Sequence, residues 1–212
     1  MKMKKIASFI LAAAALVASL SVNAQETPNL GLPDNSASPC PEMASAKPSY
    51  FARNYTVTKN EKGQMVLTPG SDIRYDANTG REYTRFADGS VQLAVTKVNG
   101  KDIETTVYRI FDDSKTYTKN VFNRREKAQK NKNEVYMGRW SRISNHGTIT
   151  RYIDCQTGIP FAVLSSDVLV QMTAGIELGE QPAKYFVLPE EKGYTLTEDG
   201  MSKLYNMMDK TK

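Results

Sequence analysis

Histidine, tryptophan and cysteine are nearly absent from this chain of 212 residues, which contains one histidine, one tryptophan and two cysteines. His146, Cys40 and Cys155 cannot supply the four ligands of a structural zinc site. The sequence also lacks the Gly-x-Ser-x-Gly elbow of serine hydrolases and a glycine-rich phosphate loop before a helix. We therefore expect no metal, no cofactor and no enzymatic activity.

Long apolar runs are also missing, except for one near the start. Lys2, Lys4 and Lys5 precede an apolar run of about 15 residues, 6–20, and the small residue Ala24 follows it. This order is typical of a secretory signal peptide, and the run is shorter than the ~20 residues that span a bilayer. We expect cleavage after Ala24 and a periplasmic or secreted protein, with no transmembrane segment in the mature chain.

The mature chain has no excess of one charge. Without residues 1–24 it contains 25 Lys and Arg against 23 Asp and Glu, a balance that does not favour a nucleic-acid partner. The one basic segment, residues 119–134, holds six Lys or Arg and two Glu. Two interpretations stay open for it: a solvated loop or short exposed helix, or a patch for anionic lipid or polysaccharide.

Proline marks the first part of the mature chain. Residues 25–54 hold five prolines and predict a flexible polar arm, because proline fixes φ and has no N–H to donate. The arm includes Cys40, which either forms a disulfide with Cys155 or leaves two free thiols. Such a disulfide would constrain the unfolded chain by about 4–5 kcal/mol in the entropic account.

Residues 55–212 predict a single, mainly β (α+β) domain. Short segments of strand-forming residues alternate with tight-turn sequences such as Asn99-Gly100, which connect antiparallel strands. We expect roughly nine to eleven strands, and the longest, 168–178, should turn its even-numbered residues to the core. In the segment 102–111, Val107 and Phe111 face one side while Tyr108 and Ile110 face the other. One face can therefore build the core while the other meets water or lines a cavity.

The C-terminal residues predict one amphipathic helix. Thr197 can cap it, and Met201, Leu204, Tyr205 and Met208 form one apolar stripe at helical spacing. We expect this helix to pack on the sheet or to lie over its open end.

Two motifs in the second half carry a family resemblance. They are the turn Asp154-Cys155-Gln156-Thr157-Gly158-Ile159-Pro160 and the segment Gln181–Pro189, followed by Gly193-Tyr194. With the secretory signal, they resemble the LolA/LolB-like superfamily of periplasmic lipoprotein carriers, in particular its uncharacterised secreted members. Over residues 73–196 the resemblance implies a curved antiparallel sheet or half-barrel, with helical cover over an apolar concavity that holds acyl chains. The chain departs from the family in its basic segment and in its lack of recognisable lid helices.

The leading hypothesis is an exported, non-enzymatic envelope protein that binds a lipid or another apolar ligand in a groove between sheet and helix. Trp140, Met172 and Ile176 would line that groove, and each of them also has a plainer interpretation as part of the core. A second hypothesis is a structural module that binds another envelope protein through the arm and the basic segment. A third is a hydrolase of envelope polymers.

The signal peptide gives the first testable prediction. Amino-terminal sequencing of the exported protein should begin at Gln25, because the small-residue site Val22-Asn23-Ala24 ends the apolar run. Full-length protein retained in the cytoplasm would contradict this assignment.

Overall fold

A computed structural model describes residues 29–37, 40, 47–125 and 132–197. Its strands form one sheet of twelve strands in the order β12-β6-β5-β4-β3-β2-β1-β11-β10-β9-β8-β7. Neighbouring strands are antiparallel, except that β12 runs parallel to β6. The predicted mainly β, antiparallel architecture is therefore confirmed. The predicted signal peptide and the apolar stripe of the predicted C-terminal helix lie outside the described residues.

Most strands follow one another through tight turns, as the turn sequences indicate. One short 3-10 helix, η1 (Ala183–Tyr185), follows the longest run of sheet. The strands are β1 (Tyr50–Lys59), β2 (Met65–Asp76), β3 (Arg81–Phe86), β4 (Val91–Asn99), β5 (Asp102–Phe111), β6 (Thr116–Arg125), β7 (Lys132–Tyr136), β8 (Arg139–His146), β9 (Ile149–Asp154), β10 (Pro160–Ser165), β11 (Val168–Leu178) and β12 (Thr195–Leu196).

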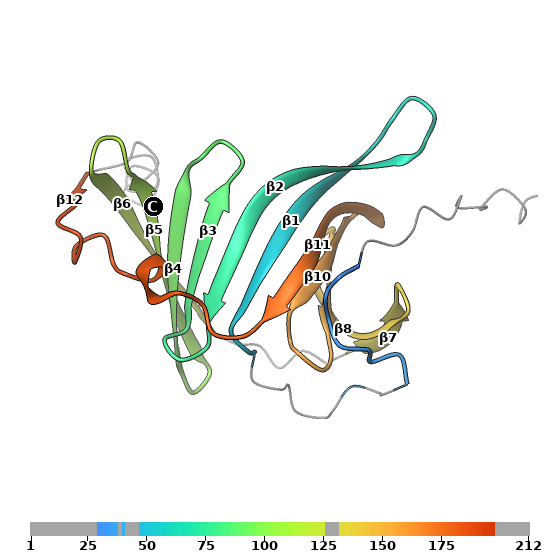
Figure 1. Cartoon of the computed structure of the whole chain (residues 1–212). Coiled ribbons are helices and arrows are strands. Elements are labelled where there is room, and N and C mark those ends of the chain that lie inside the picture. Colours follow the sequence, from blue (N-terminus) through green and yellow to red (C-terminus); the bar gives the residue numbers. More distant parts are fainter. Residues whose placement is uncertain (1–28, 38–39, 41–46, 126–131, 198–212) are drawn as a thin grey trace, which may run out of the picture.

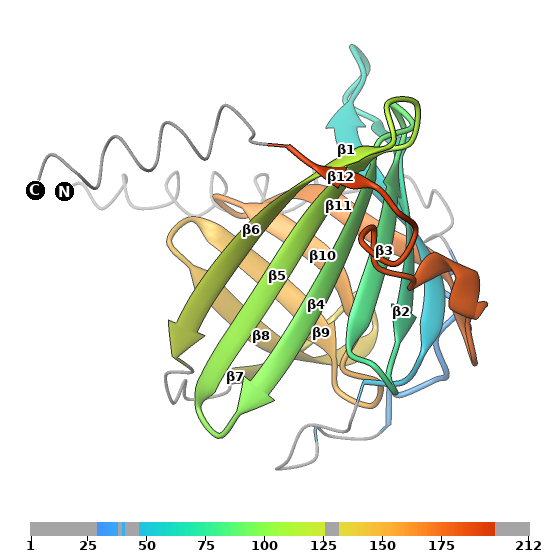
Figure 2. The ribbon, with the colours of Figure 1, turned by 90° about the vertical axis from the view of Figure 1, so that its left-hand side faces the viewer.

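The sheet bends strongly, as Figures 1 and 2 show. In Figure 2, β4, β5 and β6 lie in front of β8, β9 and β10, so the two halves of the sheet face each other across the bend. The strand order ends at β12 and β7, and the sheet is therefore open rather than a closed barrel.

The two faces of the sheet can be followed from strand to strand, because directly paired residues point to the same side. We call outer the face that contacts residues 183–194 and residues 29–35 of the arm, both of which lie on the outside of the bend (Figures 1 and 2). We call the opposite face inner. One path of paired residues along the outer face is Tyr117, Ile110, Val91, Arg85, Asp72, Arg53 and Ala174, and one along the inner face is Thr118, Arg109, Gln92, Thr84, Ile73 and Ala52.

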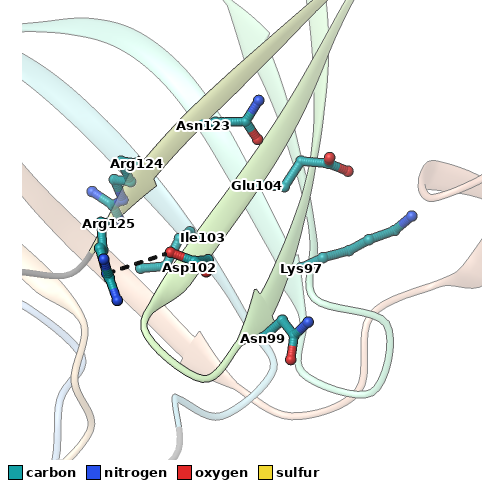
Figure 3. Close-up of a pocket in the computed structure, with 8 residues that line it drawn as sticks. All are labelled: Lys97, Asn99, Asp102, Ile103, Glu104, Asn123, Arg124 and Arg125. Atoms are coloured by element: carbon teal, nitrogen blue, oxygen red, sulfur yellow. Dashed lines mark ion pairs between the residues drawn. The ribbon is translucent and has the colours of Figure 1, made fainter.

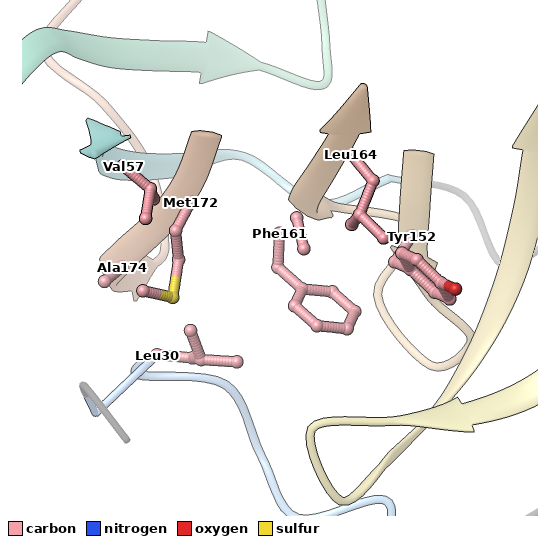
Figure 4. Packing of buried hydrophobic residues seen from close by; sticks show 8 residues of the cluster. Leu30, Val57, Tyr152, Phe161, Leu164, Met172 and Ala174 are labelled. Carbon is pink, nitrogen blue, oxygen red and sulfur yellow. The ribbon is translucent and has the colours of Figure 1, made fainter. Parts of the chain in front are cut away.

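The first part of the core lies on the outer face of β1 and β9–β11, under the arm (Figure 4). Phe161 is fully buried there, and Leu30 from the arm packs on the same cluster. The rings of Tyr136 and Tyr152 stack with their centroids 3.9 Å apart. The described arm residues around Leu30 are therefore part of the folded core, and β1 begins at Tyr50, within the range 25–54 whose composition predicts a flexible segment.

The second part of the core lies on the outer face of β3–β6. Leu93 and Tyr108 pack there against Phe186 from the segment after η1. Arg74 fixes this segment, since its guanidinium lies 4.5 Å from the Phe51 ring and 4.4 Å from the Tyr185 ring. Residues 183–194 thus cover the outer face of β3–β6.

Asp154 is the most heavily bonded side chain of the fold and is fully buried. Its Oδ2 accepts hydrogen bonds from Asn35 Nδ2 at 2.6 Å and from Arg139 Nη2 at 2.7 Å. Its Oδ1 accepts from the backbone N–H and the hydroxyl of Thr157, both at 2.8 Å. Arg139 also donates to the carbonyl of Pro33, so one carboxylate joins the arm, the β7–β8 turn and the β9–β10 turn.

A disulfide between Cys40 and Cys155 joins the arm to the same turn, with the two Cα atoms 4.9 Å apart. Of the two states that the sequence left open, the structure has the bonded one. The backbone N–H of Cys155 donates to the carbonyl of Trp140 at 3.1 Å, which fixes the turn against β8.

A matched pair of truncations tests the assignment of the core. Phe161→Ala should lower the free energy of unfolding by about 3–5 kcal/mol, because Phe161 is fully buried. Phe122→Ala should change it by less than about 1 kcal/mol, because Phe122 is 58 % exposed on the inner face. Urea unfolding of both variants measures the difference, and equal losses would contradict this core.

The buried carboxylate gives a second matched pair. Asp154→Ala should cost about 3–5 kcal/mol, because it leaves the Arg139 guanidinium, only 11 % exposed, without its counter-charge. Asp72→Ala breaks the ion pair with Arg53, whose side chains are 44 % and 46 % exposed, and should cost at most about 1 kcal/mol. Thermal and urea unfolding under oxidising conditions would show whether the two carboxylates differ.

Candidate functional site

Exposed apolar side chains gather on the inner face. Among the described residues, Phe122 is 58 % exposed and Val98 is 66 % exposed, and both lie on this face of β4–β6. Of the large apolar side chains that are exposed in the described part, only Val121 and Leu196 are not on the inner face. The others are Val66, Phe86, Val98, Phe111, Phe122, Val135, Val168 and Leu178.

The two-sided pattern predicted for β5 is confirmed. Tyr108 and Ile110 are buried on the outer face, whereas Phe111 is exposed and Val107 half-buried on the inner face. The outer set packs under residues 183–194. The inner set is therefore the surface that the fold leaves available on β5.

Small hydroxyl side chains separate the apolar residues of the inner face. Thr84 and Thr118 are buried at 6 % and 3 % exposure, and Thr173 donates to Asn54 Oδ1 at 2.6 Å. These β-branched side chains lie on the same face as the larger phenylalanines.

One end of the inner face is closed. Tyr50 and Ile73 form a packed cluster there with Ala52, Ile159 and Ile176. Lys47 of the arm covers this end, with its ammonium 4.0 Å from the Tyr75 ring centroid and 3.1 Å from Glu82 Oε2. The inner face is thus covered by the arm where β1, β2 and β3 meet at this end.

The structure separates the three residues predicted to line a ligand groove. Met172 is 1 % exposed in the outer-face cluster beside Phe161, and Ile176 is 3 % exposed in the cluster at the closed end. Trp140 is partly buried and lies on the inner face opposite Val135. The structure therefore does not bring the three together: Trp140 and Ile176 lie on the inner face, but Ile176 is buried at its closed end, and Met172 lies on the outer face.

The even-numbered face predicted for 168–178 holds only in the middle of β11. Met172 and Ala174 are buried on one side, as predicted. Val168 is 56 % exposed, however, and the odd-numbered Thr173 is only 7 % exposed. The register with β10 shifts near Val170, and the register with β1 shifts at Gly175, which has a φ of +60°. Each shift inserts a residue and changes which side the following residues face.

A hollow of about 540 Å³ lies at the β4–β5 hairpin and the end of β6 (Figure 3). Arg125 and Asp102 form an ion pair across it with Nε and Oδ1 3.8 Å apart. Only Ile103 and Arg124 of its lining lie on the inner face. The full lining is Lys97, Asn99, Asp102, Ile103, Glu104, Asn123, Arg124 and Arg125.

The basic segment 119–134 includes most of β6 and the start of β7, together with residues 126–131, which lie outside the described part. The interpretation as a solvated loop or short exposed helix does not hold for the described residues of the segment, which are strand. Its interpretation as a patch for anionic lipid or polysaccharide stays a prediction. Because β6 and β7 stand toward opposite edges of the sheet, this connection links the two edges. Seven Cα steps from Arg125 to Lys132 reach at most about 25 Å. The end of β6 and the start of β7 are therefore no farther apart than this distance.

The shifted pKa values belong to packing and to turns. Burial, with a hydrogen bond to Glu134, raises the pKa of Tyr152 to about 12. Burial also raises the pKa of Tyr83, which packs on Tyr185. Hydrogen bonds from Ser90 lower the pKa of Asp88 in an exposed turn. These shifts have structural causes, and they place no acid or base near neutral pH.

His146 ends β8 on the surface, where its Nε2 lies 3.2 Å from Ser144 Oγ. Among the described residues, no three Cys, His, Asp or Glu side chains are grouped so that they could hold a metal ion. No helix in the described part of the chain is both long and apolar enough to cross a membrane.

No protein-family model matches the chain, and no curated protein matches it either.

Proposed function

We propose that this is an exported, non-enzymatic envelope protein whose inner sheet face binds the apolar chain of a lipid or a similar small molecule. The observation that carries the proposal is the concentration of exposed large apolar side chains on the one face that the covering segments leave open. Patches of this kind mark binding surfaces when they are contiguous. The resemblance to the LolA/LolB-like carriers supports the same activity.

The energetics of such binding are reasonable. Covering one exposed phenylalanine or valine removes apolar area worth about 1.5–3 kcal/mol when burial is complete. Phe111, Phe122, Val98 and Val107 lie on the adjacent strands β4–β6, so one chain could contact several of them. After the cost of immobilising the ligand, micromolar affinity, about −8 kcal/mol, is a realistic expectation.

Partner binding is the second candidate, because β7 stands at one end of the strand order and carries the exposed Val135. An edge strand can add a strand from another chain. That interaction would use the backbone of β7 rather than the side chains of the inner face. The two functions therefore respond to different substitutions.

Adjacent residues of β6 provide the decisive test. Phe122→Ala should weaken binding of the neutral probe 1-N-phenylnaphthylamine at least fivefold, because it removes apolar contact area from the inner face. Val121→Ala should leave binding unchanged, because Val121 is similarly exposed but lies on the outer face. Titration followed by probe fluorescence, with Trp140 emission as a second signal, measures both.

The same preparation, purified after export, should carry co-purified lipid detectable by mass spectrometry. If the folded wild-type protein neither binds the probe nor carries lipid, the lipid-binding proposal is wrong and partner binding remains. Equal losses in the Phe122→Ala and Val121→Ala variants would place any ligand elsewhere than on the inner face.

A further inference from the structure

The strand carboxylates are concentrated on one face of the sheet. Among the strand carboxylates of the described residues, Glu82 alone lies on the inner face, and it is already paired with Lys47 at 3.1 Å. The remaining strand carboxylates, Asp72, Asp76, Asp102, Glu104, Glu134, Asp154 and Glu177, lie on the outer face.

Strand arginines, unlike the carboxylates, occur on both faces, and three of them lie on the open part of the inner face. Arg109, Arg124 and Arg151 are exposed there. Arg142 shares the face but is buried and already has a partner. Asp88 in the β3–β4 turn lies close enough to Arg109 to feel its charge. Arg124 and Arg151 are therefore the clearest uncompensated cations of this surface within the described residues.

Each of these arginines stands beside apolar neighbours on the same face. Arg109 lies between Val107 and Phe111 along β5, because residues two apart on a strand share a side. Arg124 follows Phe122 by two residues on β6 and pairs with Ile103. Guanidinium groups recognise carboxylate and phosphate oxygens, and their apolar neighbours can contact an acyl chain.

We propose that the ligand of the inner face is an acidic amphiphile, whose anionic head group binds Arg124 or Arg151 while its chain lies on the adjacent apolar side chains. This inference rests on the proposed binding function and adds the charge of the ligand to it. The absence of unpaired strand carboxylates from this face removes the repulsion that an anion would meet on the outer face.

Three ligands with the same twelve-carbon chain separate charge from apolar contact. Dodecanoate, 1-dodecanol and dodecyltrimethylammonium should each be tested below micelle formation for displacement of 1-N-phenylnaphthylamine from the exported protein at pH 8. We expect dodecanoate to displace the probe at a concentration at least tenfold lower than 1-dodecanol, and the cation to be the weakest. The advantage of dodecanoate should fall as NaCl is raised from about 20 to 300 mM, because salt screens exposed charges.

The double variant Arg124→Gln/Arg151→Gln should remove that tenfold advantage, about 1.4 kcal/mol, and leave displacement by 1-dodecanol unchanged. Arg85→Gln is the matched control, because Arg85 is an exposed strand arginine on the outer face. Unchanged urea unfolding would show that the double variant is folded. Equal displacement by dodecanoate and 1-dodecanol in the wild type would overturn the inference and leave the proposed function standing. If the probe itself does not bind, the proposed function fails first.

Discussion

The fold depends on the buried carboxylate of Asp154 and on what it ties together. Through Asn35 and Arg139 it holds the arm against the turns that begin β8 and end β9, and the Cys40–Cys155 disulfide joins the same two parts. A carboxylate at 0 % exposure is tolerated only when cations and hydrogen-bond donors surround it. These contacts hold the described arm residues where Leu30 lies on the outer core.

That position has a consequence for the opposite side of the sheet. Leu30 and Phe186 come from segments far apart in the sequence, yet both cover the outer face. Most described residues form the twelve strands, and the two covering segments both lie on the outer face. Little of the described chain is therefore left to cover the inner face. The open inner face is thus a result of where the covering segments are anchored, and its exposed Phe122 needs no local explanation.

Much of the fold follows from local sequence, because tight turns and alternation of apolar residues report on neighbouring residues only. Asn99-Gly100 forms the predicted hairpin, and Tyr108 packs as the alternation of β5 indicates. The residue types of Val135–Ile143 favour a single strand, but Met137 and Gly138, at φ of 50° and 74°, form a turn between β7 and β8. Methionine is a poor turn signal, since positive φ is strained for its side chain, so the sequence offers little warning.

The candidate site was harder to predict than the fold for a related reason. Burial of Met172 and Ile176 follows from their apolar character, but which face stays open depends on contacts between distant segments, such as Arg74 with Tyr185. Strand alternation predicts that Val107 and Phe111 share a side, and only the arm and residues 183–194 determine that this side is exposed. Once the faces are known, the position of every charge in the strands follows from parity and register. The near absence of strand carboxylates from the inner face, where Arg124 and Arg151 are exposed, is therefore a property of the sequence that becomes readable only through the fold.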